Sequence, residues 1–233
     1  MKENAAVDGK ERAGVWAAAQ VMDGMTVGLG TGSTAAHFVR ALAKRIQDED
    51  LKIQMAASSF SIAILAGELG LPLLSLDQVD HLDVYADGAD EVDPQKRLIK
   101  GRGAAMVREK ILAHVAKRFL VLIEPIKCVE RLGVRFPVPV ETLPFAQNLV
   151  RHELTALGAS SVTLRMATEK DGPVITDQGN FVLDARFPKS VEVAGLEPML
   201  DAIPGVVGHG LFARYSKRIT VAIGHATGVE VVP

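Results

Sequence analysis

The first half of the chain alternates short aliphatic segments with longer amphipathic ones, and this alternation constrains the fold most strongly. Segment 26–29 is compact and apolar, as expected of a buried strand, and segment 34–47 places its apolar residues on one helical face. Further strands are expected over residues 52–56, 82–86 and 119–123, and further helices over residues 10–22, 61–69 and 104–116. Strands separated by helices predict an α/β fold, with an open, mostly parallel sheet and helices on both faces.

The pattern changes near residue 132. The run 136–140 contains two prolines, which a central strand would not tolerate. Beyond it, strands are expected over residues 161–166 and 181–185, and helices over residues 145–157 and 193–202. The final strands, 219–223 and 229–232, are expected to rejoin the first sheet. We therefore expect a larger α/β domain of residues 1–131 and 208–233, and a smaller α+β domain of residues 132–207.

Charge and composition exclude several classes of partner. The 233 residues include 26 Lys and Arg against 28 Asp and Glu, and no basic stripe that would bind a nucleic-acid backbone. The longest stretch without charged side chains, 24–39, is too short and too rich in glycine to span a membrane. The sequence does not begin with the basic and then apolar order of a secretion signal, and the single cysteine, Cys128, fits a reducing compartment. We expect a cytoplasmic protein with no nucleic-acid or membrane partner.

The loop between the first strand and its helix combines glycines with hydroxyl side chains. Glycines let a ligand approach the backbone closely, and amides at a helix N-terminus suit an anion, so Thr31, Gly32, Ser33 and Thr34 are candidates for binding phosphate. The alternative is an ordinary turn in which a Ser or Thr caps the helix. The loop lacks the third glycine of the dinucleotide fingerprint and the lysine of a Walker loop, so NAD and ATP are not expected.

An acidic run, residues 87–93, directly follows the expected strand 82–86. Ligands of open α/β sheets bind at the carboxyl ends of the strands, so Asp87 and Asp90 are expected in the binding crevice. Crowded carboxylates raise the proton affinity of one of them, which suits acid–base chemistry. A solvated acidic turn and a magnesium site are the alternatives for this run.

A cationic loop, residues 100–103, precedes the helix that carries Glu109. Lys100 and backbone amides of this loop could stabilise an oxyanion. The helix dipole weakens Glu109 as a base, so a catalytic role would require its burial. The alternative is a solvated, salt-bridged helix face.

Metal-ligand and nucleophile motifs are absent from the sequence. The six histidines show no metal-ligand spacing with one another or with Cys128, and no Gly-x-Ser-x-Gly elbow is present. We expect neither a metal nor a cofactor.

Taken together, these segments resemble ribose-5-phosphate isomerases of the A type, and the resemblance covers nearly the whole chain. The specific motifs are Gly-Thr-Gly-Ser-Thr at residues 30–34 and Asp-Gly-Ala-Asp-Glu at residues 87–91. The other matching segments are Ser58-Ser59, Lys100-Gly101 with Arg108-Glu109-Lys110, Lys127 before Leu132-Gly133, residues 137–141, Thr176-Asp177 with Gly179-Asn180, and residues 203–207 with 210–212.

The resemblance implies a metal-independent interconversion of ribose 5-phosphate and ribulose 5-phosphate in the pentose phosphate pathway. The implied enzyme is a homodimer or homotetramer with a Rossmann-like and a ferredoxin-like domain. Glu109 matches the base, Lys100 the group that stabilises the enediolate, and Asp87 and Asp90 the groups that open the sugar ring. The implied substrate-binding residues are Thr31, Gly32, Ser33, Thr34, Asp87, Gly88, Ala89, Asp90, Lys100, Gly101, Arg102, Gly103 and Lys127.

Arg102 departs from the family pattern, because a run of glycines is usual there. If residue 102 needed a positive φ, an arginine would be strained or would crowd the substrate; otherwise its side chain would point outward. Two other functions are alternatives at this point: a non-catalytic sugar-phosphate sensor of the same fold, and an amino-sugar phosphate deaminase.

Overall fold

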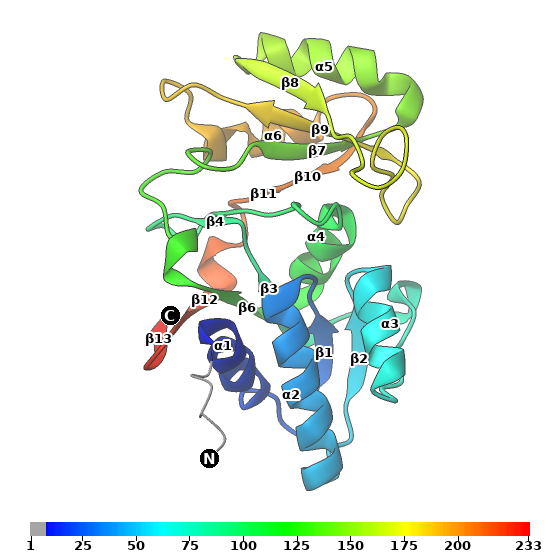
Figure 1. Ribbon diagram of the computed structural model, residues 1–233, viewed down its shortest axis with the longest axis vertical. Helices are drawn as coiled ribbons and strands as arrows, with labels where there is room; N and C mark the ends of the chain where they lie inside the picture. Colours follow the sequence, from blue (N-terminus) through cyan, green and yellow to red (C-terminus); the bar gives the residue numbers. More distant parts are fainter. Residues whose placement is uncertain (1–7) are drawn as a thin grey trace. The chain divides into compact units, whose positions relative to one another are not determined.

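The computed structural model describes residues 8–233. The chain divides into two compact units: the first comprises Met1–Gly88, Leu112–Lys127 and Arg218–Pro233, and the second comprises Ala89–Ile111 and Cys128–Lys217 (Figure 1). The prediction that no secretion signal begins the chain falls partly on residues 1–7, which lie outside the described residues. Among the described residues, no helix is long and apolar enough to cross a membrane.

The boundaries of the two units differ from the expected ones at residues 89–111, 128–131 and 208–217, which belong to the second unit. The physical reason is a three-stranded sheet of very short strands, in the order β11-β5-β4. Its members are β4 (Glu91–Val92), β5 (Leu98–Ile99) and β11 (Leu211–Phe212). Ile99 is buried in the same apolar cluster as Val138 and Leu183 of the second unit. Strands of two residues carry too little periodicity to be predicted from sequence.

The first unit is built on a six-stranded sheet in the order β13-β12-β6-β3-β1-β2. Its strands are β1 (Thr26–Leu29), β2 (Gln54–Ala57), β3 (Leu82–Gly88), β6 (Ala116–Ile123), β12 (Ile219–His225) and β13 (Gly228–Val232). Every pair is parallel except the terminal pair β12 and β13. This confirms the open, mostly parallel sheet, and it also confirms that the last two strands rejoin it.

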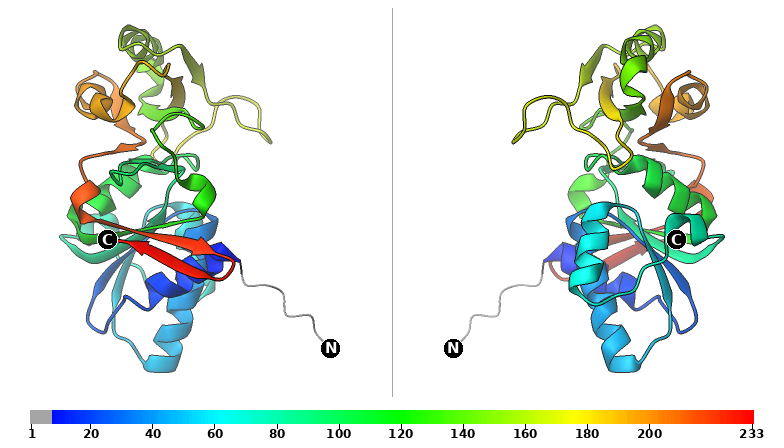
Figure 2. Two further views of the ribbon diagram at one scale, coloured as in Figure 1. Left: turned by 90° about the vertical axis from the view of Figure 1, so that its left-hand side faces the viewer. Right: turned by 90° about the vertical axis from the view of Figure 1, so that its right-hand side faces the viewer.

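Helices lie on both faces of this sheet (Figure 2). They are α1 (Gly9–Ala18), α2 (Ser33–Glu49), α3 (Phe60–Glu68) and the last turn of α4 (Met106–Val115), with 3₁₀ turns η1 (Leu76–Gln78) and η2 (Pro125–Lys127). Helices α1 and α2 pack closely, because Gly14 of α1 leaves no room for a Cβ, which would lie 2.6 Å from the Phe38 nitrogen of α2. The prediction of an α/β fold with helices on both faces of the sheet is therefore confirmed.

The second unit contains a four-stranded antiparallel sheet in the order β10-β7-β9-β8. Its elements are β7 (Val138–Thr142), η3 (Pro144–Ala146), α5 (Gln147–Ala156), β8 (Ser161–Leu164), β9 (Phe181–Arg186), η4 (Val193–Leu196), α6 (Glu197–Asp201) and β10 (Val206–His209). A 3₁₀ turn, η5 (Ser216–Arg218), precedes β12. The β-α-β-β-α-β order with this strand arrangement is the ferredoxin-like pattern. The prediction of a small α+β unit is thus confirmed.

The expectation that residues 136–140 would not form a central strand is wrong, because β7 lies between β10 and β9. Pro139 pairs with Asp184 of β9, while its carbonyl accepts a hydrogen bond of 2.8 Å from Gly210, just beyond the end of β10. In a strand, the amide and carbonyl of one residue face the same neighbour. A backbone N–H at residue 139 would therefore point toward the end of β10 and not toward β9. Because of this, the lack of an N–H at Pro139 removes no hydrogen bond from the pairing of β7 with β9.

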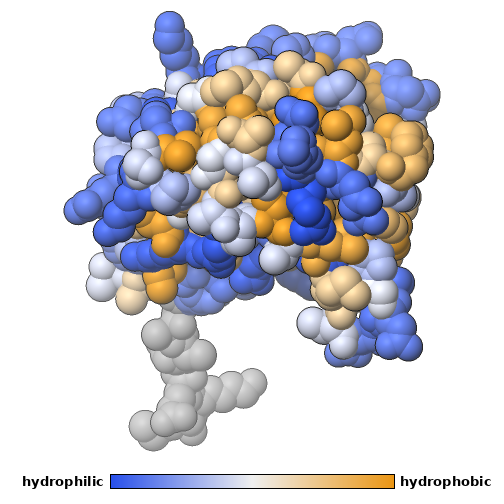
Figure 3. Space-filling view, turned by 90° about the horizontal axis from the view of Figure 1, so that it is seen from above, coloured by the Kyte–Doolittle hydropathy of each residue, from blue (hydrophilic) through white to orange (hydrophobic). Residues whose placement is uncertain are grey.

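The second unit exposes several large apolar side chains. Phe145 is 87% exposed, and Leu149, Met199 and Val207 are also exposed. Figure 3, whose view looks onto this unit, shows apolar surface gathered among hydrophilic side chains. An apolar area of this kind is typical of a surface that contacts another protein chain.

Candidate functional site

The predicted residues fall into two groups, one in each unit. The first unit holds Thr31, Gly32, Ser33, Thr34, Asp87, Gly88 and Lys127, and the second holds Ala89, Asp90, Lys100, Gly101, Arg102, Gly103 and Glu109. Each group is described within its own unit.

In the first unit, the glycine-containing loop and Asp87 meet at the carboxyl ends of neighbouring strands. The Thr31 amide donates a hydrogen bond of 2.9 Å to Oδ1 of Asp87. The Thr31 hydroxyl lies 2.7 Å from the Ser58 hydroxyl and 2.8 Å from the Ser59 hydroxyl, which follow β2. The ends of β1, β2 and β3 are thus joined by polar contacts at the edge where open α/β sheets bind ligands.

The Asp87 carboxylate is fully buried and held by three donors. Its Oδ1 accepts from the Gly88 amide at 2.7 Å as well as from Thr31, and its Oδ2 accepts from the Tyr85 hydroxyl. Tyr85 in turn stacks on Phe119, with ring centroids 4.8 Å apart. Tyr85 was not among the predicted site residues, although strand alternation places it on the same face as Asp87, two residues away.

Gly30 makes this arrangement possible. A Cβ at residue 30 would lie 2.4 Å from the Asp87 carboxyl carbon and 2.5 Å from the Ala86 carbonyl oxygen. No real Cβ approaches other atoms that closely, so the Asp87 side chain occupies the space that a larger residue would need. This glycine is required by the buried carboxylate rather than by its own backbone angles.

Helix α2 begins without a side-chain cap. Its N-cap is Gly32, which has a φ of 100° and no side chain that could accept a hydrogen bond from the first turn. Ser33 and Thr34 lie in that turn, where backbone N–H groups have no acceptor within the helix. The alternative of an ordinary Ser or Thr cap therefore does not describe this loop, and an anion could bind here. Lys127 ends η2, shortly after β6.

In the second unit, Asp90 is tied to the loop that contains Arg102. The Asp90 amide donates to Ile99 at 2.8 Å, and Oδ2 of Asp90 accepts a hydrogen bond of 3.0 Å from the Arg102 amide. The positive φ angles of this loop fall at Gly101, with 106°, and at Ala104, with 57°, and not at Arg102. Arg102 is exposed. The arginine is therefore accommodated without the backbone strain that its position could have caused.

Lys100 and Glu109 form a buried pair in the second unit. The Lys100 ammonium lies 3.4 Å from Oε1 of Glu109, and the residues are only 3% and 4% exposed. The Lys100 amide donates to the Gly210 carbonyl at 2.9 Å, and its ammonium lies 5.8 Å from the centre of the Phe212 ring. Glu109 is thus buried, as a base near a helix N-terminus requires, and it does not belong to a solvated helix face.

Lys110, the residue after Glu109, anchors helix α4 to the segment around β11. Its ammonium donates to the Leu211 carbonyl at 2.7 Å, lies 3.1 Å from Nδ1 of His209, and lies 5.0 Å from the Phe212 ring centre. Burial lowers the pKa of Lys110 to about 8, although Glu197 and Asp201 oppose this shift.

His209 is fully buried beside this ammonium. Burial, followed by the charge of Lys110, lowers the pKa of His209 to about 3, so its ring is neutral near pH 7. Nδ1 accepts from the Leu211 amide at 3.2 Å, which leaves the proton on Nε2, 2.9 Å from Oδ1 of Asp201. The neutral ring therefore links α4 to α6.

The remaining acidic residues of the run have structural partners. Glu91 is fully buried and accepts hydrogen bonds of 2.6 to 2.7 Å from the amides of Gly133, Arg135 and Phe136. Asp93 accepts from the Arg97 amide and side chain. Within residues 8–233, no group of three His, Cys, Asp or Glu side chains could hold a metal ion.

The motif at residues 176–180 is also structural. Glu141 is buried in β7 and accepts hydrogen bonds from the Thr176 hydroxyl at 2.8 Å and the Asn180 amide at 2.9 Å. Burial raises the pKa of Glu141. These contacts fix the turn between β8 and β9 to the central strand of its sheet.

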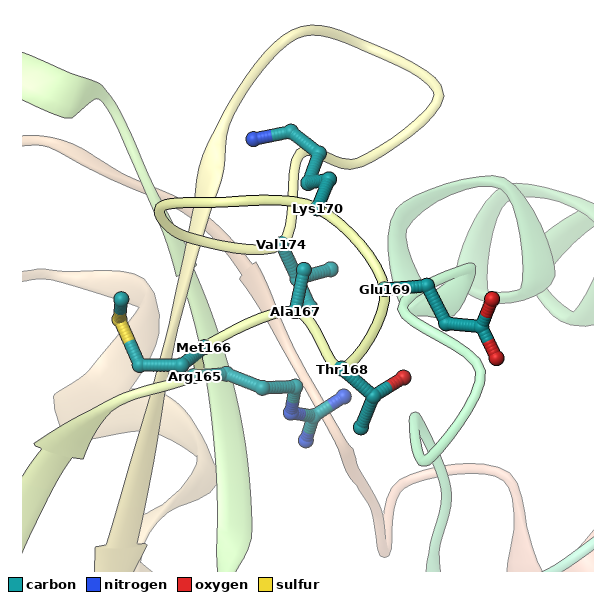
Figure 4. Close-up of a pocket in the computed structure, with 7 residues that line it drawn as sticks. All are labelled: Arg165, Met166, Ala167, Thr168, Glu169, Lys170 and Val174. Atoms are coloured by element: carbon teal, nitrogen blue, oxygen red, sulfur yellow. The ribbon is translucent and has the colours of Figure 1, made fainter.

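A hollow of about 520 Å³ lies within the loop that follows β8 (Figure 4). It is lined by Arg165, Met166, Ala167, Thr168, Glu169, Lys170 and Val174, none of which was predicted as a site residue. One of them, Arg165, donates hydrogen bonds to the carbonyls of Gly101 at 2.8 Å and Arg102 at 3.1 Å. No local sequence pattern indicates this contact, because it joins segments more than sixty residues apart.

Comparison with known proteins identifies the family. The family model of ribose 5-phosphate isomerase A (phosphoriboisomerase A) matches residues 54–228. The chain is 49% identical to ribose-5-phosphate isomerase A of Thermosynechococcus vestitus over 222 residues, covering 95% of this chain and 94% of the relative. It is 47% identical to the protein of that name from Thermococcus kodakarensis over 211 residues, covering 90% and 91%.

Solved structures agree with these sequence matches. The ribose 5-phosphate isomerase A of Methanocaldococcus jannaschii superposes with a TM-score of 0.90 at 40% identity, covering 97% of this chain and 98% of that one. A D-ribose-5-phosphate isomerase in complex with phospho-erythronic acid also gives a TM-score of 0.90, at 42% identity, covering 96% and 97%. The resemblance inferred from the motifs is confirmed, and the chain belongs to the ribose-5-phosphate isomerase A family.

Proposed function

We propose that this protein interconverts D-ribose 5-phosphate and D-ribulose 5-phosphate, and that it serves the pentose phosphate pathway. The observation that carries the proposal is the buried pair of Lys100 and Glu109, 3.4 Å apart, in a chain that matches named isomerases along almost its whole length. An aldose becomes a ketose when one proton moves between adjacent carbons through an enediolate, and this pair contains the base and the cation that such a step needs.

In this mechanism Glu109 removes the proton from C2 of the open-chain sugar and returns it to C1, while the proton of the C2 hydroxyl passes to the oxygen on C1. The charge that develops on the substrate oxygen is stabilised by the Lys100 ammonium and by backbone amides of the 100–103 loop. Burial of both side chains excludes water, which strengthens their electrostatic interaction with the enediolate. The relative solved with phospho-erythronic acid supports this, since that acid has a planar, anionic carboxylate like the enediolate.

The substrate in water is mainly a closed ring, so a proton must first move between the ring oxygen and the anomeric oxygen. We assign this step to Asp87 and Asp90. For substrate binding we assign the amides of α2 and the hydroxyls of Thr31, Ser33 and Thr34 to the phosphate, together with Lys127. The other proposed substrate-binding residues are Gly32, Gly88, Ala89, Gly101, Arg102 and Gly103.

The proposal includes a metal-independent, cofactor-free reaction in the cytoplasm, without nucleic-acid or membrane partners. The single cysteine and the absence of a basic stripe in the sequence support this location and the absence of nucleic-acid partners.

We also propose that the protein is a homodimer or homotetramer. The apolar surface around Phe145 supports this, since a side chain of that size is seldom so exposed without a partner.

The testing experiment uses purified protein treated with a chelator and mixed with ribose 5-phosphate, while ketose formation is followed by NMR. We expect turnover without metal. Glu109→Gln should keep substrate binding and lower kcat by about 10³-fold or more, because it keeps the shape of the side chain and removes the base. A Glu109→Gln variant with near-normal kcat would refute the assignment of the base.

The other outcomes distinguish the alternatives. Binding of ribose 5-phosphate by the wild type without any conversion would show a sugar-phosphate sensor. Release of ammonia from glucosamine 6-phosphate would show a deaminase. Activity that disappears with chelation and returns with added metal would refute the metal-independent mechanism.

A further inference from the structure

We infer that Arg165 is a positioning residue for the proposed isomerase reaction, because it fixes the peptide planes of the 100–103 loop and thereby sets where the Arg102 and Gly103 amides point. The inference rests on the proposed function. It concerns a side chain outside all the motifs that suggested that function, more than sixty residues away in sequence from the loop that it holds.

The Arg165 guanidinium is fixed from two sides. Its Nε and Nη2 donate to the two carboxylate oxygens of Asp184 in β9, at 2.8 and 2.5 Å. Both side chains are largely buried, with 16% and 18% exposure. A bidentate pair of this kind holds the guanidinium plane in one orientation.

The remaining nitrogen of the guanidinium contacts the loop. Nη1 donates to the carbonyl oxygens of Gly101 at 2.8 Å and Arg102 at 3.1 Å. Figure 4 shows the Arg165 side chain extending away from Met166, which lies on the other side of the chain. Two consecutive carbonyls therefore accept from a single, rigidly held cation.

The planarity of the peptide bond converts this contact into a constraint on two amides. In a trans peptide the C=O and N–H of one unit point in opposite directions. Because Arg165 holds the Gly101 carbonyl, the Arg102 amide points the other way, and it donates to Oδ2 of Asp90 at 3.0 Å. By the same geometry, the Gly103 amide points away from Arg165.

The positive charge also strengthens these donors. A cation at the carbonyl oxygen polarises the peptide, which makes the N–H of the same unit a better hydrogen-bond donor. Arg165 thus acts on the substrate only through the loop, by aligning Asp90 for ring opening and the Gly103 amide with the place where negative charge develops. The φ of 106° at Gly101 allows the backbone to adopt the required turn.

The test compares Arg165→Met and Arg165→Lys with the wild type. Misplacement of a reacting group by about 1 Å costs up to about 100-fold in rate, so we expect Arg165→Met to lower kcat/KM by about 10- to 100-fold. Arg165→Lys should recover part of this loss, since an ammonium can still contact a carbonyl but cannot form the bidentate pair. Asp184→Asn should resemble Arg165→Lys, and it tests the inference if Arg165→Met does not fold.

Binding and spectroscopy separate positioning from simple loss of folded enzyme. Calorimetry with phospho-erythronic acid should give a Kd weakened by about 10-fold or more, with the number of sites unchanged. The amide signals of Arg102 and Gly103 in ¹⁵N-labelled protein should shift upfield when Arg165 is replaced. The matched control is Arg151→Met, which removes another arginine that donates to a carbonyl of β8 but does not contact the loop.

Two results would overturn the inference. One is an Arg165→Met protein with unchanged kcat/KM, unchanged Kd and unchanged amide signals. The other is a loss of activity matched by fewer binding sites at an unchanged Kd, which indicates a stability role alone. Wild-type turnover of ribose 5-phosphate is measured first, so failure of the proposed function is recognised separately.

Discussion

At the scale of single residues, Gly30 and Asp87 show that a loop glycine can be required by a neighbouring side chain. Asp87 is fully buried and its carboxyl carbon would lie 2.4 Å from a Cβ at residue 30. The sequence suggested that the glycines of this loop allow a phosphate to approach the backbone. In the structure, the absence of a side chain at Gly30 leaves room for the Asp87 carboxylate, which accepts hydrogen bonds from three donors.

We predict that Gly30→Ala lowers kcat/KM by about 100-fold, because the added methyl group displaces the Asp87 carboxylate. Crowding of this kind costs about 1–3 kcal/mol, so the Tm should also fall. Gly67→Ala in α3 is the matched control, since a Cβ there meets nothing within 4 Å. Alanine is also the better helix former, and this variant should be neutral or slightly stabilised. A Gly30→Ala protein with normal kinetics would contradict the packing described here.

At the scale of elements, sequence patterns predicted the long helices and the parallel strands well. The strand over 26–29 has the same bounds in the structure, and the helix expected over 34–47 is Ser33–Glu49. Long periodic segments carry enough repeats to define a face. The patterns failed for β4, β5 and β11, which have two residues each, and for β7, where Pro139 is tolerated because β10 has ended.

The candidate site was predictable to the extent that its residues lie in local motifs. Asp87 and Asp90 lie at or just after the end of β3, and Glu109 lies in the first turn of α4, so strand and helix rules place them. Lys100 follows β5, which the patterns did not predict, and only its motif indicated it. Tyr85 could have been found by strand alternation. Arg165 and Asp184 could not, because their contact with the 100–103 loop depends on how distant segments pack.

Helix α4 carries both Glu109 and Lys110, and its attachment to β11 and α6 through His209 should depend on pH. The His209 pKa is lowered from 6.5 to about 3, with Lys110, Asp201 and Arg214 as charged neighbours. Between pH 6.5 and 3 the unfolded chain takes up a proton that folded His209 does not. The free energy of unfolding must therefore fall as the pH falls through this window.

We predict that His209→Gln flattens this part of the stability profile. Urea midpoints of wild type and variant, measured from pH 7 to pH 4, should converge as the pH falls. Arg214 and His209 lower the pKa of Asp201 below its usual 3.8, against the effect of burial. Asp201 therefore loses its contribution to stability mainly below pH 4, so the difference between the two profiles above pH 4 reports on the histidine. Parallel profiles would show that folded His209 titrates normally.

At the scale of the whole molecule, the exposed apolar side chains of the second unit bear on assembly. Phe145 precedes α5, and Leu149 lies four residues later, so both can contribute to one surface. Symmetric oligomers bury the same patch from both subunits, and an aromatic side chain is a frequent anchor of such an interface.

We predict that Phe145→Asp shifts the proposed oligomer toward a smaller species, as measured by light scattering after gel filtration. A charge placed in an apolar interface is costly to bury, so dissociation should follow without loss of the fold. Ile64→Asp, which alters an exposed apolar residue of α3, should leave the mass unchanged. An unchanged mass for Phe145→Asp would show that this surface is not the interface.

The division of the chain into two discontinuous units has a consequence for how such a protein can evolve. The polypeptide passes between the units at residues 88, 111, 127 and 217, and the third of these passages follows Lys127 directly. Neither unit corresponds to an uninterrupted stretch of the gene. A single recombination event, or a truncation from either end, therefore cannot transfer or delete one unit intact. Such a gene is expected to be inherited and exchanged as a whole, and changes of specificity should arise by point substitution rather than by shuffling of domains.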